Sequence, residues 1–130
     1  MKELTKQEAV ENHRKMWNWI ADETLKRKRK VTKAEYFCEM NVDEDCIPLF
    51  TCYCCEYGDQ KSNFRRPASR CVSKCKHCPL DWKSEIDDLM CINKYKDGDF
   101  KGLFGKLDFE TDYKKCAELA REIANLEERK

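Results

Sequence analysis

The sequence contains no long apolar run, and this absence restricts where the protein can reside. No segment approaches the roughly 20 apolar residues of a membrane-spanning helix. Residues 1–15 contain neither the apolar stretch nor the small-residue cleavage site of a secretory signal. We therefore expect a cytoplasmic protein without a membrane partner. Thiols stay reduced in such a compartment, where clustered cysteines bind metal more often than they form disulfides.

The chain also lacks the short motifs that mark common enzyme classes. It has no G-x-S-x-G, H-E-x-x-H, Walker or GxGxxG motif. It has only two histidines, and His13 lies on the apolar stripe of a predicted helix, where a packed, hydrogen-bonded histidine is usual. We therefore expect no enzymatic activity.

Length and composition indicate one domain with a lean core. The chain has 130 residues, of which 41% are hydrophobic and 39% are charged. A core of this size benefits from an additional cross-link, such as a bound metal or a disulfide. The ten cysteines of the chain can supply one. We expect N-terminal helices over residues 1–45, a zinc-knuckle region over 46–92, and a loop with a C-terminal helix over 93–130.

Hydrophobic periodicity predicts a long helix at each end of the chain. The first begins at a capping box formed by Thr5 and Glu8 and should run to about residues 26–30. The second covers about 111–128. Because neither helix can bury its stripe alone, we expect antiparallel packing. The expected stripes comprise Ala9, His13, Met16, Trp17, Ile20, Thr24 and Leu25, and Tyr113, Cys116, Ala117, Ala120, Ile123 and Ala124.

Shorter elements are expected between these helices. A second capping box, Thr32 with Glu35, predicts a helix over about 33–40. Residues 46–54 are apolar and β-prone, which predicts an edge or irregular strand. A further short helix is expected over residues 84–91. Residues 96–110 contain three of the four glycines and indicate a loop or weak hairpin, with these side chains turned inward: Phe100, Leu103, Phe104, Leu107 and Phe109. The predicted class is a mainly helical α+β domain with two long terminal helices packed around the zinc-knuckle subdomain.

Six of the ten cysteines lie between residues 52 and 78, and four of these form two pairs. Cys52-x-x-Cys55 and Cys75-x-x-Cys78 are separated by 19 residues, a spacing typical of zinc sites. A two-residue spacer lets one tight turn direct both sulfurs at one ion, and two such knuckles supply a tetrahedron of thiolates. The sequence therefore predicts one zinc ion bound by these four cysteines.

Several other ligand sets remain open. Cys54, Cys71, His77 and Cys91 could replace a member of the set or complete a second zinc site. Four cysteines also suit an iron–sulfur cluster, although the pairs resemble zinc knuckles. A thiol–disulfide motif would need a cysteine at the start of a helix after a strand, and neither pair indicates one. The remaining cysteines are expected to be small buried hydrophobes: Cys38, Cys46 and Cys116.

Two clusters of positive charge are candidate phosphate or nucleic-acid contacts. They comprise Lys28, Arg29 and Lys30 at the end of the first helix, and Arg65, Arg66 and Arg70 in the basic segment 61–83. The net charge of +1 favours the alternative of a solvated helix end and an ordinary loop.

Two tryptophans have separate expected roles. Trp19 lies about 160° around the helix from Trp17, so it is a candidate partner contact if exposed, unless the second helix covers it. Trp82 is expected to cap the second knuckle.

Four stretches resemble a group of small proteins from phages and prophages of Gram-positive bacteria. They are "HRKMWNWIADET", "CYCCEYG", "CKHCPLDW" and "LAREIANLEERK". The group comprises cysteine-rich zinc-knuckle proteins to which no activity is assigned. The resemblance implies cytoplasmic expression during infection and zinc bound by Cys52, Cys55, Cys75 and Cys78.

Binding is the function expected from these observations. The leading hypothesis is a zinc-binding phage accessory protein that inhibits or redirects a host protein, such as one of a defence system. The alternative is a nucleic-acid or nucleotide-binding protein that uses the basic segment 61–83.

Overall fold

The computed structural model describes residues 3–48, 51–61, 78–82 and 102–128. These residues are mainly helical, which confirms the helical part of the predicted class, and none of them forms a β-strand. The predicted helix over 84–91 lies outside the described residues. The elements are α1 (Lys6–Arg27), α2 (Lys33–Glu39), a 3₁₀ turn (Glu44–Cys46), α3 (Tyr53–Lys61), α5 (Leu103–Phe109) and α6 (Tyr113–Ala124).

Helix α1 is the central element of the fold and begins and ends as the sequence predicts. The Thr5 side chain accepts a hydrogen bond from the Glu8 backbone N–H at 3.1 Å. The helix ends at Arg27, and Lys28 adopts a left-handed conformation with φ of 54°. Most of the predicted stripe is buried, but Leu25 is 49% exposed because the helix end extends beyond the core.

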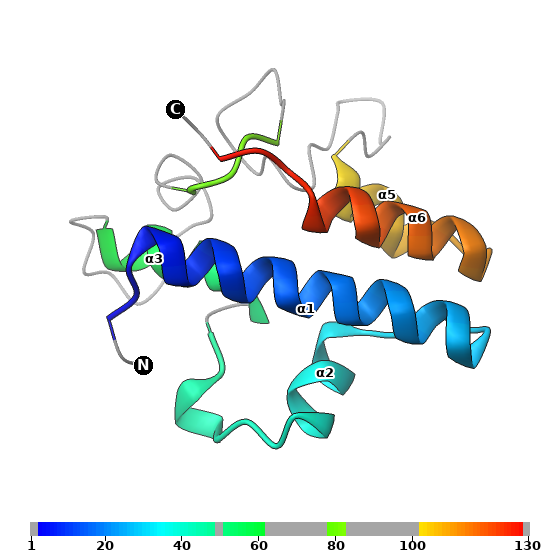
Figure 1. Ribbon diagram of the computed structural model, residues 1–130, viewed down its shortest axis with the longest axis horizontal. Coiled ribbons are helices and arrows are strands. Elements are labelled where there is room, and N and C mark those ends of the chain that lie inside the picture. The colour runs from blue at the N-terminus through cyan, green and yellow to red at the C-terminus, as the bar shows by residue number, and fades with distance from the viewer. Residues whose placement is uncertain (1–2, 49–50, 62–77, 83–101, 129–130) are drawn as a thin grey trace.

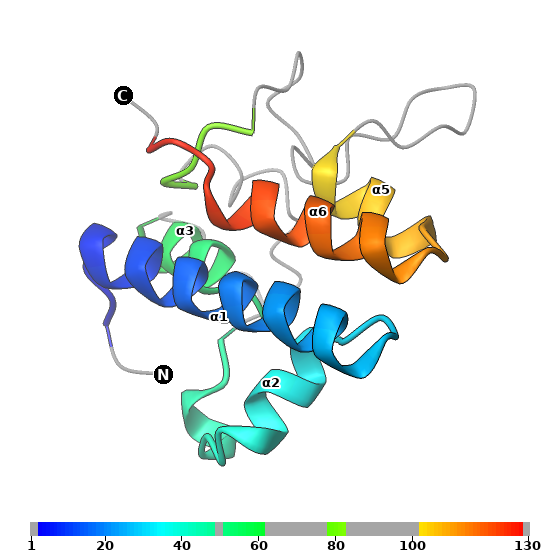
Figure 2. The same cartoon turned by 45° about the vertical axis from the view of Figure 1, so that its right-hand side comes forward.

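Helices α1 and α6 pack antiparallel, as predicted from their apolar stripes (Figures 1 and 2). The His13 ring bonds the Ile123 carbonyl at 2.9 Å, and Arg121 bonds the Asn18 side chain at 2.8 Å. Helix α6 is shorter than the predicted 111–128, because the chain leaves the helix after Ala124. The residues that follow pair with a distant segment instead of continuing the helix.

Helix α2 covers the side of α1 that faces away from α6 (Figure 1). Its predicted capping box is confirmed: Thr32 accepts from the Glu35 N–H, and the Glu35 side chain accepts from the Thr32 N–H at 2.7 Å. The Tyr36 ring packs edge-on against Trp19 with centroids 5.3 Å apart. Tyr36 and Phe37 thereby extend the core beneath α1.

The predicted loop over 96–110 contains helix α5, so the loop prediction is wrong for the described part. Leu103, Phe104 and Leu107 recur at helical rather than alternating spacing. Phe104 packs edge-on against Trp17 at 6.0 Å between centroids, and the helix lies against α6. Phe109, expected to point inward, is 66% exposed.

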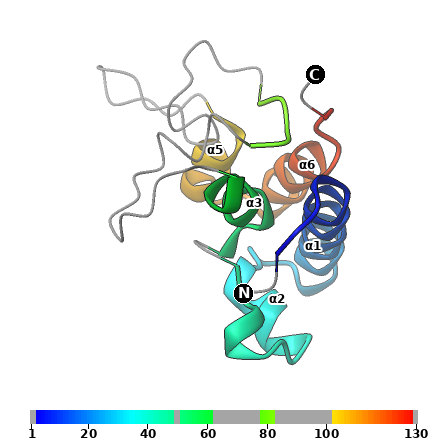
Figure 3. The same ribbon diagram turned by 90° about the vertical axis from the view of Figure 1, so that its left-hand side faces the viewer.

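The strand predicted over 46–54 is not observed among the described residues, and its end is helical. Tyr53 and Cys54 form the first turn of α3, and both are buried. The Cys52 carbonyl accepts the Glu56 N–H at 3.0 Å, which begins the helix. Figure 3, viewed from the end of α1 where the chain begins, shows α3 beside α1. Burial of one helical face against α1 overrides the β-propensity of the apolar residues.

Candidate metal centre

The structure describes three of the four predicted zinc ligands. Cys52 and Cys55 flank the start of α3, and Cys78 lies in the segment 78–82. The fourth ligand, Cys75, lies outside the described residues. So do three of the four alternates, namely Cys71, His77 and Cys91; the fourth, Cys54, is described.

The first cysteine pair lies at the N-terminus of helix α3. Cys52 immediately precedes the helix, and its Sγ accepts a hydrogen bond from the Cys55 backbone N–H at 3.4 Å. A sulfur in this position takes the place of the oxygen acceptor of an ordinary helix cap, and the positive end of the helix dipole favours a thiolate there. Thiol–disulfide motifs also require a cysteine at the N-terminus of a helix. The sequence did not indicate that Cys52 has this position. The described residues contain no strand before it.

The segment 78–82 carries Cys78 to this helix start. Its Leu80 is fully buried and forms an isolated antiparallel bridge with Glu128. The adjacent Asp81 N–H donates to the Glu127 carbonyl at 2.9 Å. The residues after α6 therefore hold the segment that carries Cys78, which explains why they leave the helix.

Trp82 contacts Cys78, the described member of the second pair. Its Nε1–H donates to the Cys78 Sγ at 3.4 Å. The ring also meets the His13 ring edge-on, with centroids 6.3 Å apart. Trp82 thus lies between α1 and the Cys78 sulfur.

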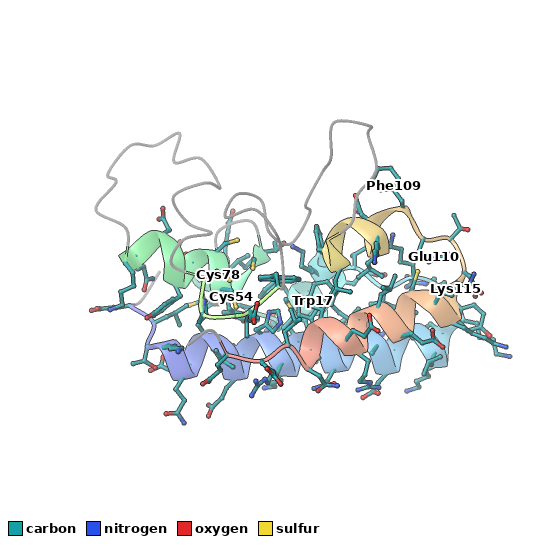
Figure 4. All side chains as sticks on the ribbon, turned by 90° about the horizontal axis from the view of Figure 1, so that it is seen from above. Trp17, Cys54, Cys78, Phe109, Glu110 and Lys115 are labelled. Carbon is teal, nitrogen blue, oxygen red and sulfur yellow. The ribbon has the colours of Figure 1, made fainter. Side chains whose placement is uncertain are left out.

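Cys54 connects the two cysteine pairs. Its side chain is 0% exposed, and hydrogen bonds with Cys52 and Cys78 raise the pKa of its thiol well above the usual value. Hydrogen bonding with Cys54 lowers the pKa of Cys52 well below its usual value, and it also lowers the pKa of Cys78. Figure 4 shows Cys54 and Cys78 close together beside α3. Cys54 thus favours the protonated thiol, and Cys52 and Cys78 have more thiolate character.

These sulfurs form one buried cluster, but not a finished metal site. Cys54 and Cys78 pack with Val10, Leu80 and Leu126, and Cys52 lies against that group. Within the part of the chain that the structure describes, no three or more histidine, cysteine or acidic side chains are arranged to hold a metal ion. The predicted set also requires Cys75.

The other cysteines fall into two groups. Cys116 is 1% exposed, as predicted, and burial raises its thiol pKa. Cys38 and Cys46 are exposed, which contradicts their prediction as buried hydrophobes. The last turn of α2 and the 3₁₀ turn carry these two thiols at the edge of the fold, where the chain reverses.

His13 packs against Trp82, the residue that contacts Cys78, a position that the sequence did not reveal. The ring is 1% exposed, and burial lowers its pKa below the usual value. Its Nε2 lies 2.9 Å from the Ile123 carbonyl, whereas Nδ1 is buried without a hydrogen-bond partner among the described residues. A histidine on an apolar stripe has the same sequence pattern whether it only packs or also binds a ligand, so no signal could have distinguished the two.

The basic end of α1 interacts with its own chain. Arg29 forms an ion pair with Glu35 at 2.7 Å, and the Lys30 ammonium donates to the Asp108 carbonyl at 2.8 Å. Lys28 is exposed and supplies the left-handed turn that ends the helix. The other predicted contacts, Arg65, Arg66 and Arg70, lie outside the described residues.

Trp19 is partly buried rather than exposed. Tyr36 covers one side of it, and the Arg27 guanidinium lies over its ring at 5.7 Å from the centroid. The alternative in which the second helix covers this ring is therefore the arrangement observed. Phe109, at the end of α5, is the most exposed large hydrophobic side chain among the described residues (Figure 4).

The comparisons with known proteins assign no family. No protein-family model, curated protein or solved structure matches the chain. A search of the described helices finds none that is long and apolar enough to cross a membrane.

Proposed function

We propose that this chain is a small zinc-binding protein that acts by binding a protein partner. The zinc is held by thiolates of the two cysteine pairs: Cys52, Cys55, Cys75 and Cys78. The observation that supports this proposal is that Cys54 and Cys78 lie in one buried cluster with Cys52 packed against it, and that interaction with Cys52 and Cys78 raises the pKa of Cys54. Sulfurs from both pairs therefore lie in one buried cluster.

The lowered pKa values of these thiols suit metal binding better than simple packing in an apolar core. Hydrogen bonding with Cys54 lowers the pKa of both Cys52 and Cys78, and the thiolate is the form that binds metal. A thiolate in a buried cluster is costly unless a cation compensates its charge. Zinc would supply that charge and connect α3 to the segment 78–82, which is otherwise attached through Leu80 and its neighbours. Folding and metal binding would then be coupled.

The partner is proposed to be a host protein of a Gram-positive bacterium, bound during phage infection. The resemblance of the helical and cysteine-containing stretches to phage proteins supports this choice. The exposed Phe109 supports binding, since aromatic side chains are enriched at interface hot spots. It borders a shallow groove of about 470 Å³ that is also lined by Glu110, Lys115 and Leu119. Figure 4 shows Phe109 at the outer edge of the molecule.

A capture experiment with paired variants tests this function. The wild-type protein and Phe109→Ser are used as baits for a host lysate. Leu25→Ser is the control, because Leu25 is another exposed large hydrophobic residue but does not line this groove. We expect one host protein to be retained by the wild type and by Leu25→Ser, but not by Phe109→Ser. The retained protein, once purified, should raise the melting temperature of the wild type. Equal retention by all three baits, or no shift with the purified protein, would contradict the proposal.

Nucleic-acid binding remains a prediction, and no contact among the described residues favours it. Two of the three basic residues at the end of α1 already interact with Glu35 and Asp108. A steep loss of nucleic-acid affinity with rising salt would revive this alternative.

A further inference from the structure

A hollow of about 840 Å³ lies between helix α6, the start of α5 and the segment 78–82. Figures 1 and 2 show α5 beside α6, and the segment 78–82 beside the residues that follow α6. Its volume is in the range of protein sites that enclose a ligand. Three apolar and three acidic residues characterise this acidic hollow, as we call it: Trp82, Leu103, Leu126, Glu118, Glu122 and Glu127.

The more buried residues of the acidic hollow are apolar. Leu126 is 8% exposed and belongs to the cluster that contains Cys78. Trp82 and Leu103 are half-buried and pack against the same cluster. A hydrophobic side chain placed on their exposed edges would remove apolar surface from water, which favours binding. The hollow therefore provides a place for a hydrophobic group of a partner.

The exposed residues of the acidic hollow carry negative charge. Glu118 and Glu122 lie one turn apart on α6 and are both exposed, and Glu127 follows the end of the helix. Like charges four residues apart on a helix repel each other. Among the described residues, no hydrogen bond or ion pair engages the side chains of these three glutamates. A cation bound here would relieve the repulsion.

The one basic residue of the lining does not supply that cation. Arg121 borders the hollow, but its guanidinium donates to the side chains of Asn18 and Asp22 on α1. A metal ion is not favoured either, because no three histidine, cysteine or acidic side chains among the described residues are arranged to hold one. Nucleic acids and anionic lipids would be repelled by the glutamates. Lysine and arginine side chains of a protein are the remaining cations.

We propose that the acidic hollow binds a basic segment of the protein partner. Lysine or arginine side chains of this segment pair with Glu118 and Glu122, and a large hydrophobic side chain packs on the exposed edge of Trp82. The inference rests on the proposed function and adds the chemistry of the partner. Glu118 and Glu122 also line the groove beside Phe109, so the two depressions form one continuous surface.

A displayed library of random short peptides, selected on the full-length wild-type protein, tests this inference. We expect the enriched peptides to combine lysine or arginine with a large hydrophobic residue. Fluorescence anisotropy with the most enriched peptide then measures the Kd. The double variant Glu118→Gln/Glu122→Gln should raise this Kd about 5-fold at low salt, because two exposed ion pairs are lost. The Kd of the wild type should also rise with salt more steeply than that of the double variant.

A matched control removes two carboxylates elsewhere. Glu44→Gln/Asp45→Asn changes two exposed residues of the 3₁₀ turn that do not line the hollow, and it should leave the Kd unchanged. On addition of the peptide, the backbone amide signals of Leu103, Glu118 and Glu122 should shift in nuclear magnetic resonance spectra of the wild type.

The other outcomes separate this inference from the proposed function. Enriched peptides without basic residues, or an equal Kd for the wild type and Glu118→Gln/Glu122→Gln, would overturn the inference. An equal rise of the Kd in both double variants, or shifts confined to the groove beside Phe109, would overturn it as well. A library with no enriched peptide would overturn the inference alone where a host protein is still retained through Phe109. Loss of that retention too would contradict the proposed function.

Discussion

The indole Nε1–H of Trp82 donates a hydrogen bond to the Sγ of Cys78, with 3.4 Å between the two atoms. The same indole ring meets His13 on α1. One side chain therefore connects Cys78 of the second cysteine pair to helix α1. A donor to a metal-bound sulfur offsets part of its negative charge and orients it.

Replacement of Trp82 by phenylalanine should weaken zinc binding. Trp82→Phe keeps an aromatic ring but removes the N–H that bonds Cys78, and loss of such a supporting contact typically lowers metal affinity about 10- to 100-fold. A competition titration against a chromophoric chelator measures this change. Trp19→Phe is the control, because Trp19 packs against Tyr36 and should leave the affinity unchanged. Equal affinity in Trp82→Phe and the wild type would show that this bond does not support the metal.

Single cysteine substitutions should separate ligands from bystanders. Cys52→Ser and Cys78→Ser are expected to lose tight zinc binding, because each removes a thiolate from the centre. Cys38→Ser changes an exposed thiol, and Cys116→Ser changes a buried thiol on α6, so both should retain the metal. Zinc content after dialysis distinguishes them. Retention of zinc by Cys52→Ser would remove Cys52 from the ligand set.

The contact between α1 and α6 should carry much of the stability of the fold. Ile123 is 0% exposed at this interface, and truncation of such a side chain typically costs about 2–5 kcal/mol. Chemical denaturation of Ile123→Ala at saturating zinc measures the free energy of unfolding. Leu119→Ala on the same helix should cost less, since Leu119 is only partly buried. A smaller loss for Ile123→Ala than for Leu119→Ala would place the core elsewhere.

The capping box of α2 should make stability depend on acid pH. Hydrogen bonds from Arg29 and from the Thr32 backbone lower the pKa of Glu35 from 4.5 to about 2. Because the folded pKa is depressed, this stabilisation is complete above about pH 4.5 and is lost as the pH falls toward about 2. The effect is less than about 1 kcal/mol, since solvent screens this largely exposed pair.

Denaturation of Glu35→Gln across the same pH range checks this dependence. The variant should lose less stability than the wild type between about pH 4.5 and about pH 2. Arg29→Gln should also make stability less dependent on pH, because it removes the hydrogen bond that lowers the pKa of Glu35 most. Identical pH profiles for the wild type and Glu35→Gln would contradict the assignment.

The helices that begin with a side-chain cap could be predicted from the sequence. Thr5 and Thr32 accept hydrogen bonds from the residues three positions ahead, so local chemistry determines where α1 and α2 start. The antiparallel pairing of α1 with α6 also followed, because two long apolar stripes can only be buried together.

The remaining helices depend on contacts that local patterns do not encode. The sequence of α3 is β-prone at its start, and burial against α1 makes it helical. Glycines at 102 and 105 suggested a loop, whereas Gly102 is the N-cap of α5 and Gly105 is buried within it. Phe109 is exposed because it is the last residue of α5, although its side chain is hydrophobic.

The candidate site was only partly predictable for a related reason. The spacing of cysteines indicates which pairs belong together, since two residues between sulfurs suit one ion. The proximity of His13 depends on the packing of α1 against the segment 78–82, which joins residues far apart in the sequence. Nothing in the neighbouring residues of His13 encodes that contact.

The metal content of the purified protein is the most direct test of the proposed zinc site. The measurement is elemental analysis of protein prepared without added metal, followed by circular dichroism after treatment with a chelator. We expect about one zinc per chain and loss of helical signal when the zinc is removed. Protein that contains no zinc, or that keeps its full helical signal after complete removal of the metal, would contradict it.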